Sequence, residues 1–298
     1  MRRIIDFQTY LGDMFNEARS VVFKKPCCYS YHPDPLEDFE DSGYTGTLKP
    51  SDDLARAMQF KMWEKGNTTS AAEQMDQNGI SYFVNLPVYP NTSFEEGLAA
   101  SKIDARFLPF SSADFSLGIL EMTKKLVSEI DLGSKGLHIQ PQIQNIKLDD
   151  ERVREAIWVF GSAGLPIAVH FGLNTYYPEG SEFLKDTPSE NSSVEKVNKL
   201  LSEHPDYSFI LVHAAVNTGD ELDSIQNGRN VYIVTSFKNT ERLKKLADRF
   251  GEDRILFGSG FPFAKPAACI KQCEKAFSGE ALDKVFYKNA IDLLKIHD

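Results

Sequence analysis

Eight short, almost wholly apolar runs recur along the 298-residue chain and alternate with segments of helical period. Such runs are typical of parallel strands buried on both faces, and their alternation with helices predicts repeated βαβ units. The expected strands are Ile4–Phe7, Ile80–Val88, Arg106–Phe110, Gly136–Ile139, Ile167–His170, Phe209–His213, Val231–Val234 and Ile255–Phe257. Eight units of this kind predict an α/β fold, a single (β/α)8 TIM barrel. An open doubly wound sheet would need a glycine-rich phosphate loop after an early strand, and the first run leads into no such loop.

The segments between the runs carry helix signals of their own. Apolar residues fall at i, i+3, i+4 and i+7 within 153–160 and again within 243–250, which predicts one helix in each segment. Ser70 and Ser192 each precede a glutamate by three residues, the spacing of an N-terminal capping box. Gly251 stands where a helix C-cap is expected.

Two stretches are too long for ordinary connections. Residues 24–50, rich in Tyr, Pro, Asp and Gly, follow the first strand. Residues 172–193, which include Tyr176–Gly180, follow the fifth. In a TIM barrel these loops lie at the C-terminal face, where barrel enzymes place their specificity. No linker, repeat or low-complexity segment interrupts the pattern, so we expect one domain over residues 1–298.

Charge and cysteine content restrict the class of partner. The 43 acidic residues outnumber the 33 basic ones, and the absence of a basic stripe argues against nucleic acid as a ligand. No apolar run is long enough for a signal peptide or a membrane span. The four cysteines match neither a zinc module nor a disulfide framework, so we expect reduced thiols and a cytoplasmic protein. The expected partner is a small-molecule substrate, and a homodimer stays open.

Three histidines occupy equivalent positions late in consecutive strands. His170 and His213 close the fifth and sixth runs, and His138 lies late in the fourth. Because neighbouring strands lie about 4.8 Å apart, side chains that turn inward there meet at one place. Three neutral imidazoles can hold one divalent metal ion, such as zinc, and leave a position open for water. They can equally act as proton acceptors, or simply satisfy the polar barrel mouth.

Other strand ends and loops supply candidates for substrate binding. Gln8 and Gln140 are expected to hydrogen-bond a carbonyl or carboxylate group of the substrate. Asp114, just beyond the third strand, is either an acid or base or the N-cap of a helix that begins near Phe115. Tyr176, in the loop after the fifth strand, suits contact with a planar substrate or with a second subunit.

The strand ends resemble those of the amidohydrolase-related proteins, the amidohydrolase family 2 branch of the metal-dependent TIM-barrel hydrolases. Each similar segment is short, but they follow one another in the family's order, each at its strand end. The segments are Ile5–Tyr10, Lys135–Pro141, Ile167–Gly172, Ile210–Val216, Arg254–Pro262 and Asn289–Leu294. The resemblance implies a barrel with a divalent metal, held by two strand-one histidines, the strand-five and strand-six histidines and a strand-eight aspartate.

The chain departs from that ligand set in a specific way. Gln8 and Tyr10 stand at the two strand-one positions, and Gly260 stands at the position of the aspartate. Only His170 and His213 carry over. An amide and a phenol are poor zinc ligands and glycine has no side chain, so the family's usual site cannot form.

Three interpretations follow from these departures. In the first, His138 joins His170 and His213 in a displaced metal site. In the second, no metal is bound; His170 or His213 acts as the base with an ordinary pKa of about 6.5, and Tyr10 acts as a donor. In the third, the barrel is catalytically inactive and binds a ligand or a protein. We expect an enzyme of hydrolase, lactonase or decarboxylase type that acts on a small, carboxylated molecule.

Overall fold

The computed structural model describes residues 3–16, 22–23, 52–171, 177, 180–182, 189–213 and 221–296. Eight strands are present in these ranges, one in each of the predicted apolar runs, and neighbouring strands pair in parallel. The strands are β1 Ile5–Thr9, β2 Tyr82–Asn85, β3 Phe107–Pro109, β4 Leu137–Ile139, β5 Ile167–His170, β6 Phe209–Val212, β7 Val231–Val234 and β8 Ile255–Leu256. The prediction of eight buried parallel strands is confirmed.

The strands follow one another in sequence order and close into a ring. One set pairs in the order β1-β2-β3 and the other in the order β4-β5-β6-β7-β8. The amide of His138 donates to the Ser111 carbonyl at 2.7 Å, which joins the end of β3 to β4. The amide of Phe7 donates to the Phe257 carbonyl at 2.8 Å, which joins β1 to the residue after β8. The fold is therefore a (β/α)8 TIM barrel.

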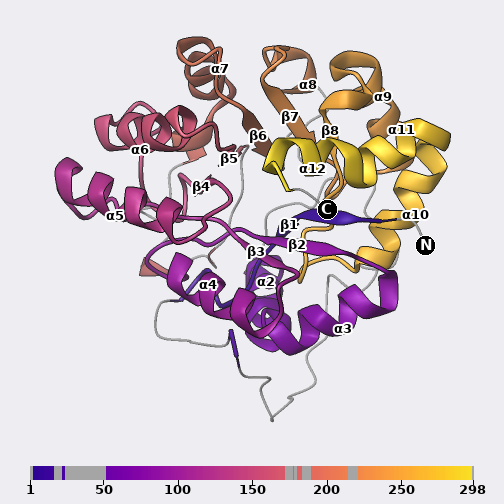
Figure 1. The fold of residues 1–298 in the computed structure, drawn as a ribbon, viewed down its shortest axis with the longest axis horizontal. Helices are drawn as coiled ribbons and strands as arrows, with labels where there is room; N and C mark the ends of the chain where they lie inside the picture. The colour runs from indigo at the N-terminus through magenta and orange to yellow at the C-terminus, as the bar shows by residue number, and fades with distance from the viewer. Residues whose placement is uncertain are drawn as a thin grey trace.

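Helices surround the strands on the outside, as the ribbon shows (Figure 1). The α-helices are α2 Asp52–Lys65, α3 Thr68–Asn78, α4 Phe94–Ile103, α5 Ile119–Asp131, α6 Glu151–Ser162, α7 Val194–Glu203, α8 Glu221–Ser224, α9 Thr240–Phe250, α10 Pro266–Ala276, α11 Gly279–Asp283 and α12 Asn289–Leu294. Shorter helical turns are η2 Ser189–Ser192, η3 Glu252–Arg254 and η4 Lys284–Lys288. The helical periods predicted in 153–160 and 243–250 belong to α6 and α9. Within the described ranges, no helix has both the length and the apolar character needed to cross a bilayer.

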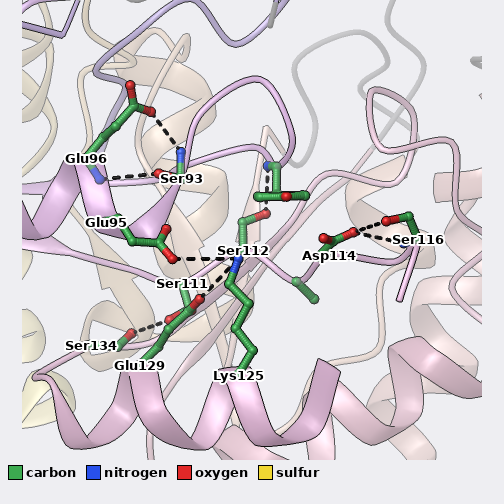
Figure 2. Close-up of polar contacts among 12 residues, drawn as sticks. Ser93, Glu95, Glu96, Ser111, Ser112, Asp114, Ser116, Lys125, Glu129 and Ser134 are labelled. Carbon is green, nitrogen blue, oxygen red and sulfur yellow. Dashed lines mark hydrogen bonds and ion pairs between the residues drawn. The ribbon is translucent and has the colours of Figure 1, made fainter. Parts of the chain in front are cut away.

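The helix ends match the sequence signals only in part. Gly251 ends α9 as predicted, with a φ of 80° and its amide bonded to the Ala247 carbonyl at 2.9 Å. The two predicted capping boxes are wrong: α3 is capped by Asn67 instead of Ser70, and α7 by Ser193 instead of Ser192. In both helices a polar side chain close to the predicted cap accepts the N-terminal amide. A complete capping box occurs at Ser93 and Glu96, at the start of α4 (Figure 2).

The carboxyl of Glu129, a residue of α5, is buried on the outside of the barrel. Figure 2 shows Glu129 beside Lys125 and close to Ser111, whose hydroxyl donates to Ser134 at 2.9 Å. The side chain of Glu129 is 4% exposed and lies 3.9 Å from the Lys125 ammonium. Burial is the main reason that the pKa of Glu129 rises to about 7, against the lowering influences of Ser111 and Lys125.

We expect Glu129→Gln to stabilise the protein at alkaline pH relative to acidic pH. The folded-state pKa lies above the ordinary value of 4.5, so folding becomes less favourable as pH rises from 4.5 through 7. The amide removes this loss, and the variant should gain about 3 kcal/mol relative to wild type between pH 4 and pH 8. Urea unfolding at both pH values measures the gain. Glu95→Gln, which removes an exposed partner of the same Lys125, is the control. An equal effect of the two substitutions would contradict the prediction.

Candidate active site

The three strand-end histidines meet at the C-terminal mouth of the barrel. His138 lies in β4 and His170 ends β5, and their ring centroids are 6.1 Å apart. His213 follows β6, and its ring centroid lies 4.3 Å from that of His170. The main chain of His213 has a φ of 65°, a conformation that non-glycine residues rarely adopt and that is common at functional sites. The predicted convergence of the three rings is therefore present.

The side-chain amide of Gln8 connects three strand ends at this place. Its nitrogen donates to the Tyr10 hydroxyl at 2.9 Å and lies in hydrogen-bond contact with Nε2 of His213. Its oxygen accepts a hydrogen bond from the hydroxyl of Ser236, at the end of β7. Gln8 and His213 are both buried. The amide thus holds Tyr10, His213 and Ser236 in fixed relative positions, which agrees with the prediction that Gln8 points inward.

Burial keeps the imidazoles neutral. It is the first cause that lowers the pKa of His138 to about 4 and that of His213 to about 3. The pKa of His170 also lies well below its ordinary value, because of burial first and of the charges of His213 and His138 second. The ordinary pKa that we expected from the sequence is wrong, since the strand ends exclude water. Burial likewise raises the pKa of Tyr10, which stays protonated.

The ring of His138 has a defined orientation. Its Nδ1 lies 2.7 Å from the carbonyl oxygen of Pro87, and a neutral ring that donates there carries its lone pair on Nε2. That Nε2 is buried and has no hydrogen-bond partner among the residues that the structure describes. A neutral imidazole held in this way by a backbone carbonyl presents Nε2 as an acceptor, and its lowered pKa makes it a weaker base than an ordinary histidine.

Aromatic rings form the walls next to the histidines. The ring centroid of Tyr10 lies 5.8 Å from that of Phe263, and Phe263 lies 6.3 Å from Phe15. Phe15 is 6.2 Å from Tyr177, and the ring of Phe237 meets that of His213 at 4.7 Å. Buried aromatic rings therefore pack around the neutral imidazoles at the mouth.

The side chains at the mouth do not fit the metal site that the resemblance implies. Gly260 has a φ of 77°, and a β-carbon there would overlap the ring of Phe237. Phe237 thus occupies the space that a strand-eight carboxylate needs. The amide nitrogen of Gln8, a donor, faces Nε2 of His213 where a ligand set would present acceptors. In the described part of the chain, no three His, Cys, Asp or Glu side chains are grouped closely enough to hold a metal ion.

The remaining predicted residues make local hydrogen bonds or lie outside the described ranges. The side-chain oxygen of Gln140 accepts from the amide of Gln142 at 3.0 Å, so it supports its own turn. Asp114 accepts hydrogen bonds from Ser116 (Figure 2). Its predicted role as an N-cap near Phe115 is wrong, because α5 begins at Ile119 with Gly118 as its cap. Tyr176 lies outside the described residues.

Two residues at the mouth were missed. Phe237 follows β7 with a φ of 58°, and its contact with both His213 and Gly260 depends on that backbone conformation. Lys238 is 2% exposed although lysine is ordinarily a surface residue. The sequence carried one usable indication, since Phe237 and Lys238 directly follow the strand end at Ser236.

The comparisons with known proteins agree with this fold. A family model described as "Amidohydrolase" matches residues 99–296. No curated protein sequence matches the chain. Among solved structures, 5-carboxyvanillate decarboxylase from Sphingomonas paucimobilis has a TM-score of 0.66 at 14% identity and covers 100% of both chains.

Two further structures of similar fold are named as a decarboxylase with bound manganese and as a probable hydrolase. The Novosphingobium aromaticivorans 5-carboxyvanillate decarboxylase, with bound manganese, has a TM-score of 0.63 at 13% identity and covers 99% of this chain and 97% of its own. A probable 2-pyrone-4,6-dicarboxylic acid hydrolase from Acinetobacter baumannii has a TM-score of 0.60 at 11% identity, over 98% of this chain and 99% of its own. At these identities the likeness establishes the fold.

Proposed function

Because the chain belongs to the amidohydrolase family, we propose that it cleaves a small, carboxylated, planar molecule at the barrel mouth, with buried neutral histidines as proton carriers and without a divalent metal. The convergence of His138, His170 and His213 beside the Gln8 amide carries this proposal. The family match begins at residue 99, so it includes all three histidines and leaves out β1. Gln8 and Tyr10 come from the part of the chain that the family match does not cover.

Decarboxylation is the reaction that these surroundings favour. Transfer of the leaving carboxylate from water to a position among neutral imidazoles and aromatic rings removes its solvation, and loss of CO2 relieves that cost. The bond to the carboxyl carbon breaks, its electrons pass into the substrate's ring, and CO2 leaves. A proton then returns to the ring carbon, and the net reaction takes one proton from solvent. Two of the three similar structures reported above are named as decarboxylases.

The side chains can divide this work among them. Nε2 of His138 accepts a proton from a substrate hydroxyl, and the adjacent His170 passes a proton to or from the reacting carbon. The Tyr10 hydroxyl accepts from Gln8 and keeps its own hydrogen for a substrate oxygen that gains negative charge. Nε2 of His213 contacts the Gln8 amide, so His213 orients the cluster in this arrangement.

The test is product analysis with two carboxylated probes. Chelator-treated protein is incubated with 5-carboxyvanillate and with 2-pyrone-4,6-dicarboxylate, and CO2 and organic products are measured by mass spectrometry. Release of CO2 supports decarboxylation. Ring opening of the pyrone without CO2 would replace decarboxylation by hydrolysis. Binding of both probes without any product would favour an inactive, ligand-binding barrel, in line with the phenyl ring that fills the aspartate position.

Metal removal should leave the protein unchanged. We expect no stoichiometric Zn²⁺ or Mn²⁺ in protein purified without chelator, because Gln8 and Phe237 occupy the space that metal ligands need. Excess Mn²⁺ or Zn²⁺ should not raise Tm, since a ligand stabilises only the folded state that binds it. Elemental analysis and thermal unfolding measure this. Bound metal that is lost in His138→Ala would instead establish the three-histidine site of His138, His170 and His213.

A further inference from the structure

The ammonium group of Lys238 is buried at the end of β7. Its Nζ donates to the carbonyl oxygen of Val234 at 3.0 Å and to that of Ser236 at 3.1 Å. Val234 is the last residue of β7, and Ser236 lies two residues beyond it. Both come after Ile233, the last residue of β7 that pairs with β6. An ammonium has three hydrogens, and two are used in this way. Among the described residues, no other acceptor bonds to the third.

The charge of Lys238 has no counter-ion in the described part of the chain. No carboxylate there forms an ion pair with it, and its two hydrogen bonds go to neutral main-chain oxygens. The neighbouring ionisable groups are Arg242 on α9 and His213 at the end of β6, which are both cationic when charged. Burial, with Arg242 second, lowers the pKa of Lys238 to about 7. Burial of an unpaired cation is costly unless an anion offsets it.

Lys238 lies against the same group of residues as the histidines. The hydroxyl of Ser236, whose carbonyl binds Lys238, donates to Gln8. The ring of Phe237, next in the chain, contacts His213 at 4.7 Å. The charge of Lys238 also lowers the pKa of His213, after burial, so the two groups are within electrostatic reach. The unpaired cation is therefore at the barrel mouth, beside the site already described.

We propose that the ammonium of Lys238 binds a carboxylate group of the ligand other than the one that is lost, and that this residue sets the preference of the mouth for anionic molecules. The inference rests on the proposed function for the identity of the ligand as a carboxylated molecule. A carboxylate at the third hydrogen of Nζ supplies the missing counter-charge and makes a charge-assisted hydrogen bond. The side chain of Lys238 thereby provides the positive charge that holds the ligand at the mouth.

The test compares two probes of nearly the same shape, the anion salicylate and the neutral salicylamide. Calorimetry on the intact protein measures both affinities. Wild type should bind salicylate at least about tenfold more tightly. Lys238→Met keeps an unbranched apolar side chain, one atom shorter and without the charge, and should lose the preference while it still binds salicylamide. Lys238→Arg should keep the preference. Lys199→Met, at an exposed position on α7, is the control and should change neither affinity.

Several results would overturn the inference. Equal binding of the two probes by wild type would do so without any variant, and so remains decisive if Lys238→Met does not fold. A tenfold preference for salicylate that persists in Lys238→Met would also overturn it. So would an equal loss of affinity for both probes in a folded variant.

Product analysis separates this inference from the proposed function. CO2 release from 5-carboxyvanillate at the same kcat/KM in wild type and Lys238→Met would contradict the role of Lys238 and leave the function standing. Selective loss of salicylate binding, with no product from any probe, would support Lys238 as the carboxylate-binding residue and contradict the function.

Discussion

Replacement of His170 by alanine is expected to lower kcat/KM by about 10²–10⁴-fold for whichever carboxylated probe the protein converts. His170 lies between the other two imidazoles, with ring centroids 6.1 Å from His138 and 4.3 Å from His213. Its loss therefore interrupts any proton transfer across the cluster. His170→Gln should be equally impaired, because an amide fills the space but does not carry a proton.

The control for this prediction is a histidine outside the mouth. His204 follows α7 and stacks on Tyr207, with ring centroids 5.3 Å apart. We expect His204→Ala to retain kcat/KM within a few-fold. Thermal unfolding must show that the His170 variants are folded. A loss of less than tenfold in folded His170→Ala would rule out this residue as a proton carrier.

Replacement of Gly260 by alanine is expected to destabilise the fold by about 2–5 kcal/mol. Two effects add: a left-handed backbone conformation costs an L-residue about 1–2 kcal/mol, and overpacking costs about 1–3 kcal/mol. Gly260 has a φ of 77°, and its new β-carbon would overlap the Phe237 ring. Urea unfolding of the variant measures the change.

A double-mutant cycle separates the two effects. In a Phe237→Ala background the ring is absent, so Gly260→Ala should cost only the backbone contribution. The double variant should then be more stable than the sum of the single changes predicts. Additive costs would mean that the Phe237 ring does not fill the space beside Gly260. The same packing opposes restoration of the family's aspartate by Gly260→Asp alone.

The barrel could be predicted because the pattern that specifies it, a short apolar run followed by a helical segment, is local and repeats along the sequence. Each apolar run became a strand, since a parallel strand covered on both faces buries such a run. The strand ends were less predictable. The run Ile80–Val88 narrows to Tyr82–Asn85, and Pro87 within it cannot donate to a ladder. Cap residues were misplaced by one to four positions, because several polar side chains near each helix start can serve as its cap.

The candidate site could be predicted only where a strand fixed it. His138, His170 and His213 were found because equivalent positions late in neighbouring parallel strands meet at one edge. Lys238 and Phe237 follow a strand instead, and their directions depend on local backbone turns that no periodicity records. The pKa values could not be predicted either, because they depend on how completely the surrounding side chains exclude water.

The place of Gln8 at the centre of the mouth also bears on how the protein becomes active. A carboxamide neither gains nor loses a proton in the physiological range, and it needs no ion to hold its neighbours. Its bonds to Tyr10, His213 and Ser236 form when the chain folds. Under the proposed metal-free function, a cluster organised in this way would be complete without a metal-loading step.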